Sequence, residues 1–146
     1  MDNMYCLAAR EGIIVEEFPF TPPLGGIYIY QEGKKPLIGL SSNIATITEK
    51  RCVFAEELGH HFTSGFCSIP REFYNYADRF VINKIEYKAM KWAALYLIPD
   101  NSLIDALRDN ICEEWELAEY FNVTDIFMRF RLDLFVKNPK NIPQYD

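Results

Sequence analysis

The sequence lacks a long apolar run and any mark of a secretory signal. Its longest nearly apolar run, Trp92 to Pro99, is far shorter than the about 20 residues that a transmembrane helix needs. The N-terminus, which begins Met1 and Asp2, has neither a basic start nor an apolar core. We therefore expect a cytoplasmic protein that has no membrane partner.

Two further absences exclude other classes of protein. The chain has no excess of basic residues, and its formal net charge of -6 argues against binding to nucleic acid through phosphate groups. It also has no C-x-x-C pair, which argues against a zinc ribbon or a thioredoxin-like site. The four cysteines stand apart from one another, at positions 6, 52, 67 and 112.

The residues that are present predict a packed domain. Hydrophobic residues make up 49% of the chain and aromatic residues 15%, which is enough for a buried core and argues against disorder. No repeat, low-complexity tract or linker divides the sequence. We expect a single domain over residues 1–146, composed of a sheet region in 1–45, two long helices in 46–99, further helices in 100–136 and a tail in 137–146.

The first third of the chain is predicted to form a short helix and a small sheet. A run of β-branched residues and two runs that flank a polar, glycine-containing loop are typical of a strand and a β-hairpin. Together they predict an antiparallel sheet. The expected elements are a helix over 2–10 and strands at 13–15, 27–30 and 37–40.

The remainder is predicted to be helical. Thr46 and Glu49 have the spacing of a capping box, so a helix is expected to begin there and to end before Gly65. An irregular loop over 67–78 should follow. A sheet followed by helices predicts an α+β fold. The later helices are expected over 83–97, 101–108, 113–121 and 124–135.

The segment Glu56-Glu57-Leu58-Gly59-His60 resembles the H-E-x-x-H pattern of metallopeptidases. Two side chains four residues apart lie on one face of a helix, so both can bind one metal ion, while the residue after the first acts as general base. Here Glu56 and His60 take the ligand positions and Glu57 takes that of the base. A carboxylate is a competent ligand of Zn²⁺. The register that pairs Glu57 with His61 puts Leu58 at the base position, so we reject it.

A third ligand is expected from the second long helix. Glu86 is the best choice, and small residues at Ala89, Ala93 and Ala94 would let its helix pack closely on the first. The cofactor is then a divalent metal, with Zn²⁺ the first expectation and Mn²⁺ or Fe²⁺ as alternatives, because carboxylates are hard ligands. The oxyanion donor is left open among His61, Tyr74, Tyr76 and Tyr87. Against all this, two adjacent glutamates on a helix are in most proteins only solvated charge.

These strings resemble the ImmA/IrrE family of metallopeptidases, of the gluzincin kind. Its members read roughly A-H-E-L-G-H and then E-x-x-A-N-x-F-A-A-x-L-L-M-P, which resemble residues 55–60 and 86–99 here. The two departures that matter are Glu56 for the first His and Met90 for Asn. The resemblance implies a zincin-like helical core and an endopeptidase that cleaves a helix-turn-helix repressor of a prophage or mobile element. The missing His leaves open a catalytically inactive module that binds the repressor.

Residues 116–125 are typical of a helix-turn-helix, with Thr124 as the N-cap of its second helix. That helix offers few polar side chains to DNA bases, because most of its residues are large and apolar. We predict that it packs against the peptidase core, and we keep a DNA-binding regulator only as an alternative function. The side chains that could face DNA are Asp125, Arg129, Arg131 and Asp133.

Overall fold

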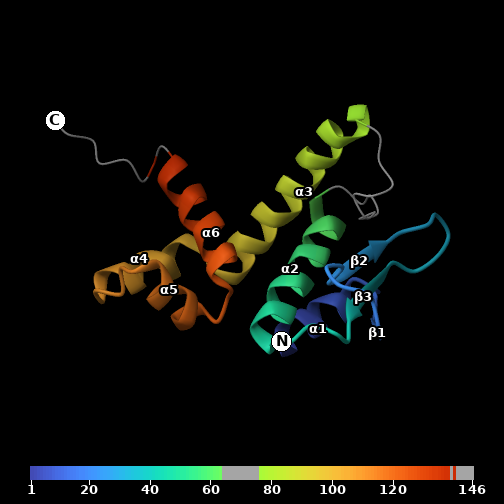
Figure 1. Cartoon of the computed structure of the whole chain (residues 1–146), viewed down its shortest axis with the longest axis horizontal. Helices are drawn as coiled ribbons and strands as arrows, with labels where there is room; N and C mark the ends of the chain where they lie inside the picture. The colour runs from blue at the N-terminus through green and yellow to red at the C-terminus, as the bar shows by residue number, and fades with distance from the viewer. Residues whose placement is uncertain (64–75, 139, 141–146) are drawn as a thin grey trace. The chain divides into compact units, whose positions relative to one another are not determined.

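The computed structural model in Figure 1 describes residues 1–63, 76–138 and 140, and over 76–83 it describes the backbone alone. The chain forms two compact units, residues 1–93 and residues 94–146, and each is described by itself. The prediction of a single domain is not tested by this division. The described part has no helix long and apolar enough to span a membrane.

The first unit contains a short helix, a three-stranded sheet and two long helices. Its first helix matches the predicted bounds, and the hairpin strands are confirmed. The elements are α1 (Asp2–Arg10), β1 (Ile14–Phe18), β2 (Gly26–Ile29), β3 (Leu37–Ser41), α2 (Ile47–Thr63) and α3 (Tyr76–Leu97), of which the last four residues belong to the second unit.

The sheet is mixed, which corrects the antiparallel prediction. Its strand order is β1-β3-β2: β2 pairs with β3 antiparallel, as expected of a hairpin, but β1 pairs with β3 parallel. The chain reverses direction once between β1 and β2 and again between β2 and β3, so β1 and β3 run the same way. Alternating residue patterns locate a strand, but they do not specify its neighbour, and here β1 joins the side of β3 that the hairpin leaves open.

One face of the sheet is covered by α2. Tyr28 of β2 and Ile38 of β3 lie opposite each other in the register, and both are buried together with Leu40. Side chains two residues apart share a face of a strand, so Gly26 and Tyr28 point to the same side. Figure 1 shows α2 beside β2 and β3.

The structure confirms the predicted start of α2 and corrects the predicted start of α3. Thr46 caps α2 as expected, because its Oγ1 accepts a hydrogen bond of 3.1 Å from the Glu49 backbone nitrogen. In contrast, α3 begins at Tyr76 and not at residue 83. Residues 76–82 contain no proline or glycine, so nothing in them stops a helix from starting earlier. The predicted loop over 67–78 lies outside the described residues as far as residue 75, and its last three residues belong to α3 instead.

The second unit contains three helices at the predicted places: α4 (Asp100–Arg108), α5 (Glu114–Phe121) and α6 (Asp125–Lys137). The Thr124 hydroxyl caps α6 by accepting a hydrogen bond of 3.3 Å from the Phe127 backbone nitrogen, which confirms the predicted N-cap. Asn122 ends α5 in the left-handed conformation, with a φ of 53°. α5 and α6 pack on each other, as predicted for a helix-turn-helix.

Arg131 holds the second unit together from inside. It is 0% exposed, and its Nε donates to the Ile98 backbone oxygen at 2.8 Å, while Nη2 lies 2.5 Å from Oδ1 of Asp100. The start of α4 is thereby tied to the middle of α6. These two contacts offset part of the cost of burying the charge, so this arginine has a structural role.

Candidate functional site

The helices α2 and α3 touch backbone to backbone at Gly59 and Ala89. A Cβ atom added to Gly59 would lie only 2.3 Å from the backbone oxygen of Ala89, which is far inside van der Waals contact. Glycine costs about 1 kcal/mol relative to alanine inside a helix, so its presence here reflects the close approach. This contact brings the side chains of His60 and Glu86, each near the crossing point, into one site.

His60 and Glu86 meet directly, as the sequence predicted. Nε2 of His60, a residue only 2% exposed, lies 3.3 Å from Oε2 of Glu86. That distance is longer than the about 2.7–2.9 Å of a charge-assisted hydrogen bond. It matches the separation of two ligand atoms at the tetrahedral angle around one Zn²⁺, which is about 3.3–3.4 Å. The pair is thus spaced as two ligands of one ion would be.

The electrostatics of the site are dominated by carboxylates. Burial lowers the pKa of the His60 imidazole, but the contact with Glu86 and the charges of Glu57 and Glu56 outweigh it, so the net pKa is raised above its usual value. Burial also raises the pKa of Glu56, and the neighbouring Glu57 and Glu86 raise it further, to about 7, although His60 opposes them. A cation placed among these groups would relieve their mutual repulsion.

Glu56 and Glu86 line the same pocket. Its volume is about 280 Å³, and its other lining residues are Tyr87, Ala89 and Met90. Met90, which stands where the similar family has an asparagine, therefore forms part of the wall of this pocket. Tyr87 is exposed and lines the pocket together with both carboxylates, and its role as oxyanion donor stays a prediction. Tyr74 and the side chain of Tyr76 lie outside the described residues.

Glu57 faces the sheet at the start of β2. It is 6% exposed, and a Cβ atom on Gly26 would lie 3.0 Å from both its Cγ and its Oε1. Gly26 therefore leaves room for this carboxylate at the edge of the sheet. The predicted base and the predicted ligands accordingly occupy neighbouring sides of α2, as a rotation of about 100° per residue requires.

His61 lies on the side of α2 that faces β2. Its Nδ1 is 3.0 Å from the hydroxyl of Tyr28, and its Nε2 is 3.3 Å from Oε2 of Glu11, which follows α1. Glu57 and His61 are four residues apart on α2, a distance of about 6 Å along the helix. Gly26 and Tyr28 are two residues apart on β2, which is a similar distance along a strand. The helix pair therefore lies against the strand pair. Both ring nitrogens of His61 thus contact other side chains.

The donor set fits a divalent metal by its chemistry and by the spacing of His60 and Glu86. Two carboxylates and one imidazole are ligands that Zn²⁺, Mn²⁺ and Fe²⁺ all accept. A site with three ligands is not formed among the residues described, because no three His, Cys, Asp or Glu side chains gather there at metal-binding geometry. The predicted ligand role of Glu56, and the role of Glu57 as base, therefore stay predictions.

Sequence reasoning did not find three features of this site. Close packing of the two helices was predicted from small residues that include Ala89, and the contact with Gly59 confirms it, but the sequence did not single out Gly59 as the contacting residue. The room that Gly26 leaves for Glu57 carries no local signal. The chain of contacts from Glu11 through His61 to Tyr28 joins positions 50 and 33 residues apart, which spacing along one helix cannot reveal.

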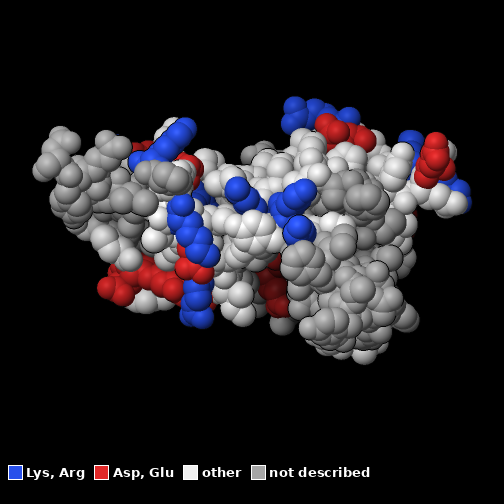
Figure 2. All heavy atoms as spheres, turned by 90° about the horizontal axis from the view of Figure 1, so that it is seen from above, with Lys and Arg blue, Asp and Glu red and all other residues white. Residues whose placement is uncertain are grey.

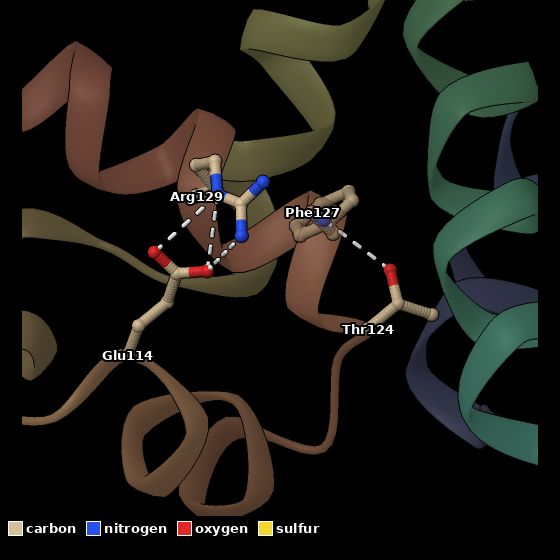
Figure 3. Close-up of polar contacts among 4 residues, drawn as sticks. All are labelled: Glu114, Thr124, Phe127 and Arg129. Carbon is tan, nitrogen blue, oxygen red and sulfur yellow. Dashed lines mark hydrogen bonds and ion pairs between the residues drawn. The ribbon is translucent and has the colours of Figure 1, made fainter.

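The helix pair α5–α6 does not present the polar face that a DNA-reading helix needs. Arg131 is fully buried, and Arg129 is bound to Glu114 of α5, with Nη2 3.0 Å from Oε1 (Figure 3). Figure 2 shows acidic and basic side chains in small groups, several of which adjoin one another, on the face that it draws. Among the four side chains proposed to face DNA, Asp125 and Asp133 are acidic and exposed, which opposes contact with phosphates.

Comparison with known proteins adds one finding. The family model described as Peptidase M78, IrrE N-terminal-like domain, matches residues 8–133, which is most of the chain. A comparison with curated protein sequences gave no match. The matched range covers α2, α3, α5 and the larger part of α6.

Proposed function

Because this chain belongs to the peptidase M78 family, that of the IrrE N-terminal-like domain, we propose that it is a metal-dependent endopeptidase that uses Glu57 as its general base. Membership in a peptidase family points to a metallopeptidase. The proposal adds which reaction is catalysed, which residues carry it out and which substrate is cut. The observation that carries it is the 3.3 Å approach of His60 Nε2 to Glu86 Oε2 beside Glu56. Two further predicted roles complete the set: Glu56 as the third ligand and Tyr87 as the oxyanion donor. We prefer Tyr87 to His61 because both ring nitrogens of His61 already contact other side chains.

In this proposal, each protein side chain has a separate task. A bound divalent metal supplies Lewis-acid chemistry, which acidifies water and polarises a peptide carbonyl. His60, Glu86 and Glu56 hold it, and Glu56 must be ionised to do so, which its pKa of about 7 permits at neutral pH. Glu57 takes the proton of the attacking water on its carboxylate and passes it to the leaving amine. Two carboxylates beside one imidazole make the metal a weaker Lewis acid than an all-histidine site would.

The substrate would lie along β2 as an extended peptide. β2 is at the edge of the sheet, and a peptide can add to such an edge through main-chain hydrogen bonds. Gly26, the first residue of β2, is next to Glu57, so a peptide bound there would pass the base. Extended binding favours a flexible or interdomain segment of a protein as the site of cleavage.

The substrate expected from the family resemblance is a helix-turn-helix repressor encoded beside this chain.

Two observations support an alternative function. Glu56 replaces the first histidine of the pattern, and the described residues do not gather three ligands, so an inactive module that binds the repressor without cutting it is the alternative. A repressor that is bound but left intact would distinguish this alternative from the enzyme.

The test is co-expression of the chain with that repressor, in three forms. The wild type and Glu49→Gln, which makes the same chemical change at an exposed position of α2, should both cut the repressor. Glu57→Gln should leave it uncut, with a loss of about 100-fold or more in rate. Equal cleavage by Glu57→Gln would overturn the assignment of the base. Loss of repressor function with full-length repressor would favour the binding module.

A further inference from the structure

The outer side of α5 carries two large aromatic side chains that are left in water. Trp115 and Tyr120 are each 57% exposed, whereas Leu117 and Ala118 on the other side of the helix are buried. Exposed Trp and Tyr side chains are unfavourable for an isolated protein and are enriched where proteins bind one another. This side of α5 therefore has the aromatic composition that is typical of a binding surface.

The two rings form the walls of a pocket. Its volume is about 470 Å³, and its remaining lining comes from Ile111, before the helix, and from Glu116 and Glu119. Trp115 and Glu119 are four residues apart, as are Glu116 and Tyr120, so two neighbouring rows of the helix each pair a ring with a carboxylate. A group bound in the pocket would meet aromatic faces and negative charge together.

The charge around the pocket indicates what that group is. Between Asp109 and Met128 the chain has no Lys or Arg and six acidic residues: Asp109, Glu113, Glu114, Glu116, Glu119 and Asp125. Glu114 is bound by Arg129, as Figure 3 shows. Across the part of the chain that the structure describes, no basic side chain forms an ion pair with Glu116 or Glu119. Their charges are available to a cation from another molecule.

We propose that this pocket docks a basic segment of a partner protein, which inserts an arginine side chain beside Trp115 and Tyr120 and toward Glu116 and Glu119. A guanidinium suits such a pocket better than an ammonium group, because it is planar, weakly hydrated and stacks on aromatic rings. The proposal rests on the second unit alone and does not depend on the peptidase assignment.

The test uses the full chain and a fluorescein-labelled peptide rich in Arg and Ala, followed by fluorescence anisotropy. A second peptide replaces each Arg with citrulline, which has the same shape and no charge. The wild type should bind the Arg peptide at least about tenfold more tightly than the citrulline peptide. Trp115→Ala and the double variant Glu116→Gln/Glu119→Gln should each weaken binding of the Arg peptide about tenfold.

The matched control is Asp109→Asn/Glu113→Gln, which removes the same charge from exposed positions outside the pocket lining. It should change the affinity by less than about twofold. An equal loss in this control would mean diffuse attraction to an acidic surface and would overturn the proposal, as would equal binding of the citrulline peptide or no binding. Sedimentation gives the remaining outcome: a dimer that Trp115→Ala converts to a monomer would assign the pocket to a second copy of this chain instead.

Discussion

His60 of α2 and Arg131 of α6 are both buried ionisable side chains, and their surroundings differ. Arg131 is bound by a backbone oxygen and by Asp100, groups that only complete the packing of the second unit. His60 meets Glu86 among other carboxylates, beside a pocket. Burial of a charge therefore does not by itself indicate a functional site. A site is indicated when the partners of the buried group are themselves ionisable and share a cavity.

Substitution of each buried group in turn should give the largest difference in the free energy of unfolding. Arg131→Met should lower the free energy of unfolding by about 3 kcal/mol, because the Ile98 oxygen loses its donor and Asp100 its partner. His60→Gln in the metal-free protein should change it by less than about 1 kcal/mol, because residues kept for function are not optimised for stability. Urea unfolding measures both.

Equal costs of Arg131→Met and His60→Gln would show that His60 has a structural role too. The comparison would then fail.

The contact at Gly59 allows a test of whether the close approach of α2 and α3 is needed for metal binding. Gly59→Ala forces a Cβ atom toward the Ala89 backbone, so α3 must move away. We expect a loss of stability of about 2–3 kcal/mol from overpacking and a loss of metal binding, measured by thermal unfolding and by metal analysis after dialysis. Gly25→Ala is the matched control, because its added Cβ meets only side-chain atoms, those of Val53 at 3.2 Å and of Ile44 at 3.8 Å.

Metal binding unchanged in Gly59→Ala would contradict the role of the helix crossing. A loss of the same size in Gly25→Ala would mean that any added methyl group has this effect.

The carboxylate cluster predicts a pH dependence that the second unit should not share. The pKa of Glu56 is 4.5 in the unfolded reference and about 7 when folded, so the folded state binds this proton more tightly. The stability of the metal-free protein should therefore fall as pH rises from about 4.5 to 7, by on the order of 2 kcal/mol. The raised pKa of His60 acts in the same direction, because its stabilisation is lost as pH rises.

Glu56→Gln should remove most of that slope, as should saturating Zn²⁺ at the upper end of the range. Urea unfolding at a series of pH values measures it. A slope that survives Glu56→Gln would assign the titration to another group.

The smallest predicted effects come from the two helix caps, one in each unit. Thr46→Ala and Thr124→Ala each remove an oxygen that accepts from the first turn, of α2 and of α6. Each should cost about 1 kcal/mol in thermal unfolding, and the corresponding Thr→Ser variants should cost much less. Only Thr46→Ala should also weaken metal binding, because α2 carries the site. Equal effects of the two on metal binding would blur the distinction between the units.

Local signals predicted much of this molecule. The capping residues Thr46 and Thr124 located two helix starts, and the polar loop between β2 and β3 located the hairpin, because each depends on neighbours in sequence. The i, i+4 spacing of Glu56 and His60, with Glu86 from α3, identified residues of which two are in direct contact. Such spacing works because a helix has a fixed geometry.

Long-range choices were not predictable from the same signals. The parallel pairing of β1 with β3 depends on which edge of the hairpin is free. The backbone contact of Gly59 with Ala89 and the contacts of His61 require the packed structure. Each of these depends on residues far apart in the chain, whose approach periodicity does not encode.

The central claim is that α2 and α3 together hold one divalent metal ion. The most direct measurement is the metal content of purified, metal-free protein after equilibrium dialysis against Zn²⁺, compared among the wild type, His60→Gln and Glu86→Gln. We predict one ion per chain in the wild type and its loss in both variants. Wild-type protein without bound metal, or variants that retain it in full, would contradict the account.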